Sequence, residues 1–260
     1  MVATQNNDSA HQNRWLLRWK QIAHPKMRLF CLPFAGGGAF YYKPWAEILA
    51  PEIEICAIQL PGRENRLRER PLTNVDTLVP IVLDTIDPLL DTPFAFFGHS
   101  MGGIIAFEVC RELRRLEKPA PNHLFISSAC APQLPRRKPL LHLMSDSELV
   151  EQLVRYGGTP KEVLEDKDMM AMMIPLLRAD FTLFETRNYI QEAPFAYPIT
   201  VFGSTTDSRV SIEEMEAWKE HTSSPLRMST FSGGHFFVKD NLERNKMLKA
   251  ISDICLTQFQ

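Results

Sequence analysis

Short apolar runs alternate with stretches of helical period along most of this chain. Each run is bounded by proline, glycine or polar residues, which is typical of strands buried on both faces. Because strands that alternate with helices build βαβ units, the pattern predicts an α/β fold with a mostly parallel central sheet flanked by helices. The predicted strands are Leu29–Phe34, Ile53–Leu60, Phe94–Gly98, His123–Ser127, Ile199–Gly203 and Leu226–Phe231, and the predicted helices are Lys43–Leu49, Val75–Leu90, Gly102–Glu117, Ile212–His221 and Leu242–Leu256.

Two segments depart from this alternation. The segment from residue 133 to about 192 has no strand pattern, and its apolar spacing predicts helices over Ser145–Tyr156, Lys161–Lys167 and Met169–Asn188. We therefore expect a helical insertion between two strands of one domain that covers residues 26–260. The first 25 residues form a predicted arm, with a disordered Asn/Gln-rich start up to about residue 13. An apolar patch at residues 15–19 would pin the arm to the domain or lie against a partner.

Composition excludes several classes of protein. The chain has 260 residues, with 29 Lys plus Arg against 31 Asp plus Glu, so its net charge of −2 excludes a broadly basic nucleic-acid binder. No apolar run approaches the ~18 residues that a membrane span requires. The five cysteines are scattered without a C-x-x-C pair, which argues against a disulfide framework or a zinc site. The polar start lacks a signal core, so a cytoplasmic protein is expected.

The strongest chemical signal is the pentapeptide Gly98-His99-Ser100-Met101-Gly102. A predicted strand precedes it and a predicted helix follows it, as in the nucleophile elbow of a hydrolase. The glycines permit a sharp turn that exposes the serine hydroxyl at the helix N-terminus, where the Met101 amide would face a developing oxyanion. The alternative is a tight glycine-rich connection with no chemical role, and the flanking strand and helix favour the elbow.

A serine nucleophile needs a base and an acid. His235 follows Ser232-Gly233-Gly234 after a predicted strand, so its loop could bring the imidazole over the elbow. Asp207 follows another strand and precedes the histidine, although turn aspartates without a catalytic role are common. Asp180 and Asp240 are competitors, the first within a predicted helix and the second after the histidine. The order Ser100, Asp207, His235 is that of α/β hydrolases.

A second oxyanion amide is expected from a loop after an early strand. Three successive glycines follow Pro33-Phe34-Ala35, and they let the backbone approach a ligand closely. The Ala35 amide is the first candidate and the Phe34 amide the second. A phosphate-cradling loop is the alternative, but no G-x-G-x-x-G or G-K-[ST] pattern is completed.

The chain resembles the type II thioesterases, the stand-alone editing enzymes of nonribosomal peptide and polyketide synthases. The resemblance covers nearly the whole chain and is most specific in the Pro-Gly-Arg-x-x-Arg and Gly-Gly-Thr-Pro elements. It departs in two places: Phe34 stands where the family often has His or Tyr, and the loop before Asp207 reads Ser-Thr-Thr. The matching segments are Arg28 to Gly37, Gln59 to Arg63 with Arg66, Phe97 to Gly103, Gly157 to Pro160, Leu177 to Asp180, Gly203 to Asp207 and Gly233 to Phe237.

The resemblance implies an α/β-hydrolase fold with a helical lid over about 133–192. It also implies the catalytic triad Ser100, Asp207 and His235, with Ala35 and Met101 as oxyanion amides. Neither a metal nor an organic cofactor is implied. Substrates would be acyl or peptidyl thioesters on the phosphopantetheine arm of carrier proteins, hydrolysed through an acyl-serine.

Substrate-binding residues are predicted with less support from the sequence. The stripe of Met169, Met170, Met172, Met173, Leu176 and Leu177 would line an acyl pocket or pack as ordinary core. From it we take Met173 and Leu177 as substrate-binding candidates, together with Phe34 and Phe236. Two basic runs, residues 63–70 and 136–138, would dock an acidic carrier protein or form solvated faces.

Three other functions share these features. A medium-chain fatty acyl thioesterase belongs to the same sequence group, and acyl-length preference would distinguish it. An acyl-CoA thioesterase or carboxylesterase would share the triad but prefer free substrates. A noncatalytic module that binds carrier proteins would lack a triad member, and none is missing.

Overall fold

The structure is a computed structural model that describes residues 14–257. A seven-stranded sheet runs through it in the order β1-β3-β2-β4-β5-β6-β7. All neighbouring strands are parallel except β1, which is antiparallel to β3. The strands are β1 Leu16–Leu17, β2 Met27–Leu32, β3 Ile53–Ile58, β4 Phe94–His99, β5 His123–Ser127, β6 Ile199–Ser204 and β7 Arg227–Phe231.

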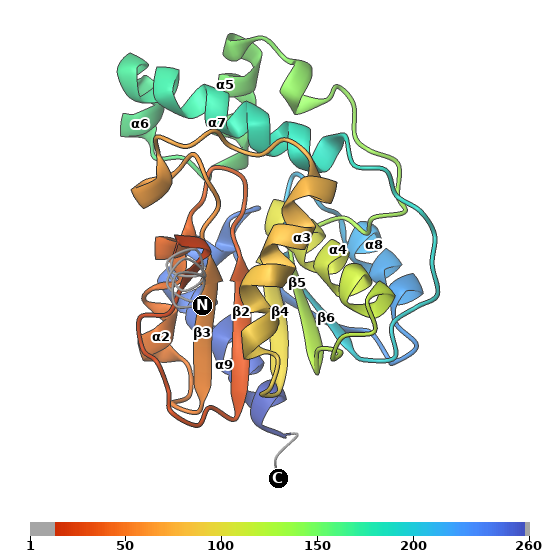
Figure 1. Ribbon diagram of the computed structural model, residues 1–260. Coiled ribbons are helices and arrows are strands. Elements are labelled where there is room, and N and C mark those ends of the chain that lie inside the picture. The colour runs from red at the N-terminus through yellow and green to blue at the C-terminus, as the bar shows by residue number, and fades with distance from the viewer. Residues whose placement is uncertain (1–13, 258–260) are drawn as a thin grey trace.

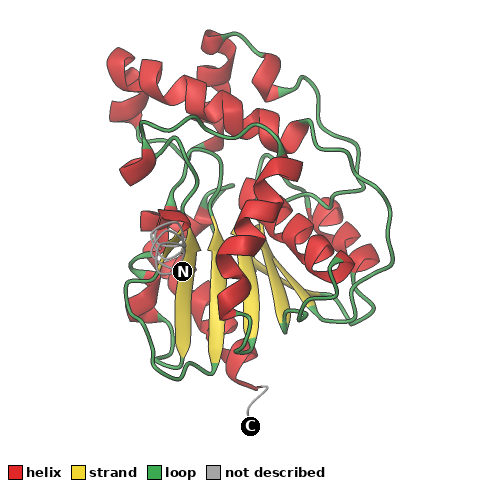
Figure 2. Ribbon diagram, in the orientation of Figure 1, coloured by secondary structure: helices red, strands yellow, loops and turns green. Residues whose placement is uncertain are grey.

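Helices cover both faces of this sheet (Figures 1 and 2). On one face lie α3 (Val75–Ile86), α4 (Met101–Arg115) and α8 (Ile212–Glu216), and on the other lie α2 (Trp45–Ile48) and α9 (Asn241–Thr257). Strands β2 to β6 are buried along their whole length, so consecutive side chains enter different cores. Phe96 belongs to the first core and Phe97 to the second. The prediction of a mainly parallel α/β sheet is confirmed.

All the predicted helices are present, several of them with shorter or divided bounds, whereas α9 is one residue longer at each end than predicted. Helix α3 begins after Asn74, whose side chain accepts from the Asp76 amide, but it ends at Ile86. Pro88 has no N–H to continue the helical pattern, so the chain goes on as the 3-10 helix η3 (Asp87–Leu89). The predicted helix at 43–49 is reduced to α2, preceded by the 3-10 helix η1 (Ala39–Tyr42). The one at 212–221 divides into α8 and the 3-10 helix η5 (Ala217–His221).

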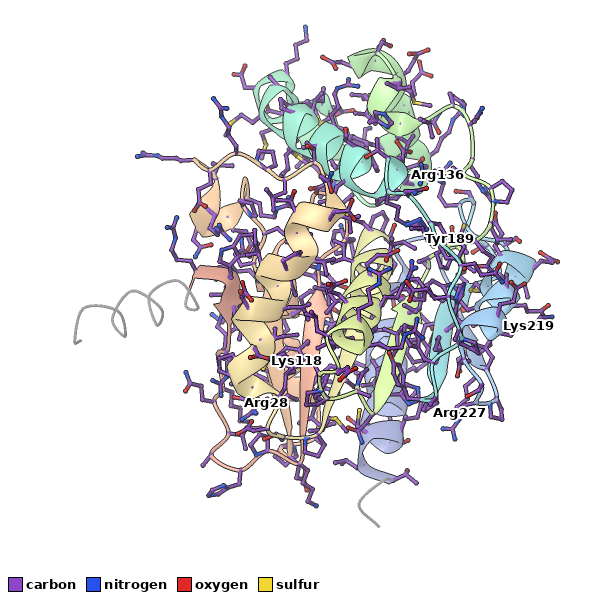
Figure 3. All side chains as sticks on the ribbon, turned by 45° about the vertical axis from the view of Figure 1, so that its right-hand side comes forward. Arg28, Lys118, Arg136, Tyr189, Lys219 and Arg227 are labelled. Atoms are coloured by element: carbon purple, nitrogen blue, oxygen red, sulfur yellow. The ribbon has the colours of Figure 1, made fainter. Side chains whose placement is uncertain are left out.

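Residues 133–192 are called the helical segment below. They contain η4 (Leu141–Leu143), α5 (Asp146–Tyr156), α6 (Lys161–Glu165) and α7 (Lys167–Glu185), and no strand lies within this described stretch. Their helices lie across the carboxyl ends of the strands, and the chain after α7 runs down beside α4, where Glu192 pairs with Arg114 (Figure 1). Helix α7 begins two residues before the predicted start because the Asp166 side chain caps it. In Figure 3, Arg136 and Tyr189 mark the two connections between the helical segment and the sheet, on one side of the molecule.

The arm lies on the domain from residue 14 onward. Leu16 and Leu17 pair with Ile58 and Ala57, and the Gln59 amide donates to the Trp15 carbonyl. The predicted disorder up to residue 13 lies outside the described residues. Within residues 14–257, none of the helices combines the length and the apolar character that crossing a bilayer demands.

Candidate active site

Ser100 occupies the turn between β4 and α4, and the backbone there is strained. Its φ of 53° lies in the left-handed region that non-glycine residues rarely adopt. The flanking glycines are required by contacts between main-chain segments. A Cβ at Gly98 would lie 2.1 Å from the Gly102 oxygen, and a Cβ at Gly102 would lie 2.2 Å from the Leu32 oxygen. Any larger residue at either position would therefore push the turn open.

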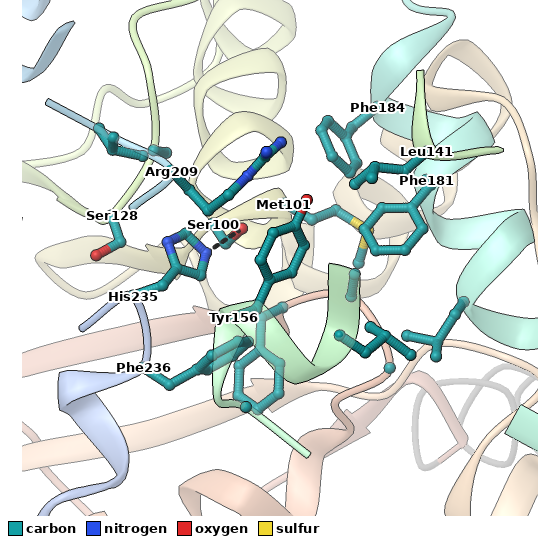
Figure 4. Close-up of a pocket in the computed structure, with 18 of the residues that line it drawn as sticks. Ser100, Met101, Ser128, Leu141, Tyr156, Phe181, Phe184, Arg209, His235 and Phe236 are labelled. Carbon is teal, nitrogen blue, oxygen red and sulfur yellow. Dashed lines mark hydrogen bonds between the residues drawn. The ribbon is translucent and has the colours of Figure 1, made fainter. Parts of the chain in front are cut away.

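His235 lies between Ser100 and Asp207. Its Nε2 is 3.1 Å from the Ser100 Oγ, and its Nδ1 is 2.9 Å from Asp207 Oδ2. Asp207 follows β6, and its Oδ1 accepts from the amides of Arg209 and Val210 at 2.7 and 3.2 Å. His235 stands in the loop after β7, and Figure 4 shows its ring facing the Ser100 hydroxyl. The structure thus brings the three predicted triad residues into one chain of hydrogen bonds.

The pKa of Asp207 is affected in opposite directions by burial and by its hydrogen-bonding partners, which together have the larger effect. Burial raises the pKa of Asp207, whereas the hydrogen bond and charge of His235 and the Arg209 amide lower it, so this pKa lies below its ordinary value. Asp207 is therefore ionised near neutral pH and accepts from the Nδ1–H of His235. An imidazole with its proton on Nδ1 presents a free lone pair at Nε2, toward Ser100.

His99, the variable residue of the elbow, is fully buried and serves packing. Its Nδ1 lies 2.9 Å from the Ser127 Oγ, and its ring contacts those of Phe34, His235 and Phe236. The pKa of His99 lies well below its ordinary value. Burial is the largest cause, and the nearby charges of His235 and Lys239 lower this pKa further. This histidine is therefore neutral, as a packing role requires.

Two backbone amides beside Ser100 remain unpaired within residues 14–257. They belong to Ala35 and Met101, and no described group accepts a hydrogen bond from either. Both residues line the cavity that contains the Ser100 hydroxyl. Met101 is the first residue of α4, so its amide also carries the positive end of the helix dipole. Together these donors are suited to an oxyanion.

A cavity of about 330 Å³ opens beside Ser100 and extends under the helical segment (Figure 4). Figure 4 shows Ser100 and His235 at one side of this cavity and Leu141, Phe181 and Phe184 at another. The substrate-binding candidates Phe34, Met173, Leu177 and Phe236 all line it. The lining is mostly apolar, and its charged members are Arg136, Arg137, Glu185, Arg187, Arg209 and Lys239. The methionine stripe divides: Met173 faces the cavity, Met170 packs among the helices, and Met172 is 62% exposed.

Lys239 lines the same cavity, and no sequence pattern indicated it. Its ammonium lies 5.0 Å from the ring centroid of Phe34 and 4.7 Å from that of Phe236, and it donates to the Gly158 carbonyl. Burial lowers the pKa of Lys239. A Cβ at Gly158 would lie 2.1 Å from the Phe236 ring, so the backbone at Gly158 lies directly on this ring. Only its position four residues after His235 could have drawn attention to Lys239.

The competing aspartates have other partners. Asp180 pairs with Arg63 at 2.7 Å, and Asp240 accepts from the amides of Leu242 and Glu243 at the start of α9. The prediction that the basic run at 63–70 forms a docking or solvated face is wrong for two of its members. Arg63 and Arg66 are 3% and 5% exposed and paired inside the protein. Among the described residues, no group of three His, Cys, Asp or Glu side chains could hold a metal ion.

Comparisons with known proteins agree with this geometry. The family model described as "Thioesterase domain" matches residues 27–255. The chain is 43% identical over 229 residues to gramicidin S biosynthesis protein GrsT of Aneurinibacillus migulanus, covering 88% of this chain and 90% of that one. It is 33% identical to the human S-acyl fatty acid synthase thioesterase, medium chain, covering 89% and 90%. The solved structure of the type II thioesterase BorB from the borrelidin biosynthetic cluster matches with a TM-score of 0.83 at 34% identity, covering 93% and 97%. The chain therefore belongs to the thioesterase family of α/β hydrolases, together with type II thioesterases of biosynthetic pathways.

Proposed function

We propose that this protein hydrolyses acyl thioesters from the phosphopantetheine arm of carrier proteins, which would regenerate misprimed or stalled modules of nonribosomal peptide or polyketide synthases. One observation carries the proposal. Ser100, His235 and Asp207 form a continuous hydrogen-bond chain at the mouth of an apolar cavity, in a chain of the thioesterase family. The named role of a relative, gramicidin S biosynthesis, supports the substrate class.

In the first step, Ser100 attacks the thioester carbonyl carbon while the Nε2 of His235 takes its proton. Asp207 holds the imidazole in the correct tautomer and stabilises the imidazolium that forms. The negative charge that develops on the carbonyl oxygen is stabilised by the amides of Ala35 and Met101. Loss of one such donor costs on the order of 3 kcal/mol of transition-state stabilisation. The carbon–sulfur bond then breaks, and His235 returns the proton to the pantetheine thiolate.

In the second step, water replaces the thiol. His235 takes a proton from the water as it attacks the acyl-serine, and the same two amides stabilise the second tetrahedral intermediate. Cleavage of the ester bond returns the proton to Ser100 and releases a carboxylic acid. These residues complete the cycle without a metal or an organic cofactor.

The acyl group would occupy the apolar cavity under the helical segment. We assign Phe34 and Phe236 to the end at His235, because the Phe236 ring contacts those of His235 and Phe34, and we assign Met173 and Leu177 to the wall that α7 forms. Unbranched methionine side chains adapt to different acyl shapes, which suits an editing enzyme. On this proposal residues 26–260 form one thioesterase domain with a lid over about 133–192, acting in the cytoplasm.

The rival functions differ in substrate. A medium-chain fatty acyl thioesterase shares the triad, but the biosynthetic relative is 43% identical and the human medium-chain enzyme is 33% identical. The higher identity to the biosynthetic relative favours the editing function over hydrolysis of medium-chain fatty acyl thioesters. A noncatalytic carrier-binding module is disfavoured because the triad residues are in hydrogen-bond contact.

Intact-protein mass spectrometry of an acyl-phosphopantetheinyl carrier domain tests the proposal. The wild type should remove acetyl and longer acyl groups, and Ser100→Ala should leave them in place because the nucleophile is gone. Ser147→Ala, the same substitution at an exposed position of α5, is the matched control and should act like the wild type.

An unchanged carrier mass, with acyl-CoA or simple esters cleaved in parallel, would contradict the carrier substrate and retain the hydrolase. Cleavage confined to fatty acyl chains of medium length would favour the rival thioesterase. Undiminished acyl release by Ser100→Ala would contradict the triad itself.

A further inference from the structure

The glycine loop that contains Ala35 is held by a side chain from α7. The Gly36 amide donates to Asp180 Oδ2 at 2.7 Å, although the two residues are 144 positions apart. The Gly37 amide donates to the Phe34 carbonyl at 2.8 Å, which closes a turn around Ala35 and Gly36. Gly36 has a φ of 75°, the value found at the third residue of a type II turn.

These two hydrogen bonds fix the two peptide planes beside Ala35. The Phe34 carbonyl and the Ala35 amide share one plane, and the Gly36 amide belongs to the next. A type II turn differs from a type I turn by the orientation of its central peptide. The bond from the Gly36 amide to Asp180 therefore fixes the central peptide of the turn, and the bond from the Gly37 amide to the Phe34 carbonyl fixes the peptide that carries the Ala35 amide.

A buried arginine completes the connection. Both Nη atoms of Arg63 donate to the Asp180 carboxylate, at 2.7 and 2.8 Å, and Nη1 also donates to the Gly37 carbonyl at 3.1 Å. The two side chains are 4% and 1% exposed. A bidentate pair of this kind is geometrically rigid, so Asp180 has no freedom to leave the loop while α7 stays in place.

Leu177 provides a second contact from the same face of α7, three residues before Asp180. A Cβ at Gly36 would lie 2.8 Å from Leu177 Cδ2, so the leucine already occupies the space beside the glycine. Helix α7 thus contacts the loop through an apolar side chain and a carboxylate together. Since the helix also lines the acyl cavity, its position bears on both the substrate and the loop.

We propose that Asp180 is a positioning residue for the oxyanion hole: it anchors the turn at Gly36, so that the Ala35 amide is held in place beside Ser100 only while α7 is seated on the loop. This inference rests on the acyl-serine mechanism proposed above. It makes the helical segment a part of the reaction machinery as well as a cover for the acyl group.

The test must separate the effect of the hydrogen bond between the Gly36 amide and Asp180 from the effect of an unpaired charge on the buried Arg63. Removal of Asp180 alone would leave Arg63 unpaired in the interior and endanger folding. We therefore compare two charge-free variants, Arg63→Met/Asp180→Asn, which keeps an acceptor for the Gly36 amide, and Arg63→Met/Asp180→Leu, which has none. Their kcat and KM are measured on p-nitrophenyl butyrate and on the acyl-carrier thioester.

The leucine variant should have a kcat about 100-fold below that of the asparagine variant, the size of effect expected when an oxyanion donor is misplaced. KM should stay similar in both. Inhibition by an alkylboronic acid, whose adduct on Ser100 places an oxygen in the hole, should weaken by the same factor. The downfield proton signal of the His235–Asp207 hydrogen bond should be unchanged, which a general loosening of the site would alter.

Asp146→Leu is the matched control, because Asp146 also holds an arginine of α7, Arg178, at 2.6 Å but lies away from the loop. It should retain wild-type kcat. Should the leucine double variant fail to fold, Arg63→Met/Asp180→Ala replaces it, because it is also free of charge and also lacks an acceptor for the Gly36 amide, and it should show the same loss of kcat and of boronic acid affinity.

Equal kcat and equal inhibition in the two charge-free variants would overturn the positioning role. So would a rise in KM alone. Wild-type activity on the ester without activity on the carrier thioester would contradict the proposed substrate and leave this inference standing, because the ester arm tests the hole by itself.

Discussion

The elbow at residues 98–103 and the glycine loop at residues 33–38 meet at the same reacting atoms but are held in different ways. The elbow is braced by main chain, since the contacts that require glycine at 98 and 102 are to backbone oxygens of Gly102 and Leu32. The glycine loop is braced by side chains from elsewhere, above all Asp180 and Leu177 of α7. The first is therefore fixed once the sheet forms, whereas the second depends on the helical segment.

This difference explains why one loop was easier to predict. A turn enforced by its own backbone must have glycines at fixed offsets, so the pentapeptide around Ser100 is visible in the sequence. A loop that is held by distant side chains shows only its glycines as a local sequence signal, because the residues that hold it lie far along the chain.

Gly102→Ala should have the largest effect, because its Cβ would meet the Leu32 carbonyl oxygen at 2.2 Å and neither backbone segment can move freely. We expect a loss of about 4 kcal/mol or more, at the upper end of single substitutions. Urea unfolding followed by circular dichroism measures it. Gly157→Ala is the control, since its φ of 68° is unfavourable but its Cβ would meet nothing within 4 Å, and it should lose about 1 kcal/mol. Equal losses would mean that the elbow is not braced by backbone.

Gly36→Ala should cost less, about 2–3 kcal/mol, through its positive φ and its contact with Leu177. The leucine tip is flexible and can yield. A double-mutant cycle with Leu177→Ala should give a coupling energy of about 1 kcal/mol, because the smaller side chain relieves the contact but not the φ. Additive losses would show that α7 does not press on the loop.

Gln59→Leu tests the far end of the glycine loop. The Gln59 Oε1 accepts from the Ala39 amide at 2.7 Å, and its Nε2 donates to the Arg63 carbonyl at 3.1 Å, both buried. Loss of these partners should cost about 2 kcal/mol. Since Ala39 lies beyond the turn at Ala35, kcat should stay close to that of the wild type. A large drop in kcat with little loss of stability would place the control of the loop at this end instead.

Asp207→Asn is a reference substitution at a residue outside both loops, and it should affect the reaction much more than the stability of the fold. It should lower kcat by about 10⁴-fold through the wrong imidazole tautomer, but it should cost only about 1 kcal/mol of stability. The folded pKa of Asp207 is below the unfolded value of about 3.9, so the carboxylate stabilises the fold above that pH and loses this effect as the pH falls through the folded pKa. The stability difference between the wild type and the variant should therefore shrink on acidification. A constant difference would mean that the charge of Asp207 does not stabilise the fold.

The sheet, its order of elements and the candidate triad could be predicted because each depends on local patterns at known offsets. The roles of Arg63 and Arg66 could not. A run of arginines is normally solvated, and nothing near residue 63 shows that a carboxylate 117 positions later is its partner. The division of the methionine stripe was equally hidden, because helical periodicity does not tell a cavity from a core. Strand β1 was missed since two residues are too few to form an alternating pattern.

That short strand has a consequence for self-association. An uncovered edge of a sheet offers unpaired amides and carbonyls to a second molecule, and aggregation often begins there. Here Leu16 and Leu17 occupy one end of the β3 edge, while Arg18 is tied to the buried Glu54 at 2.6 Å farther along the same strand. A chain shortened to begin after Arg18 would keep its triad and its cavity but would lose this cover, and strand-to-strand dimers should form at β3.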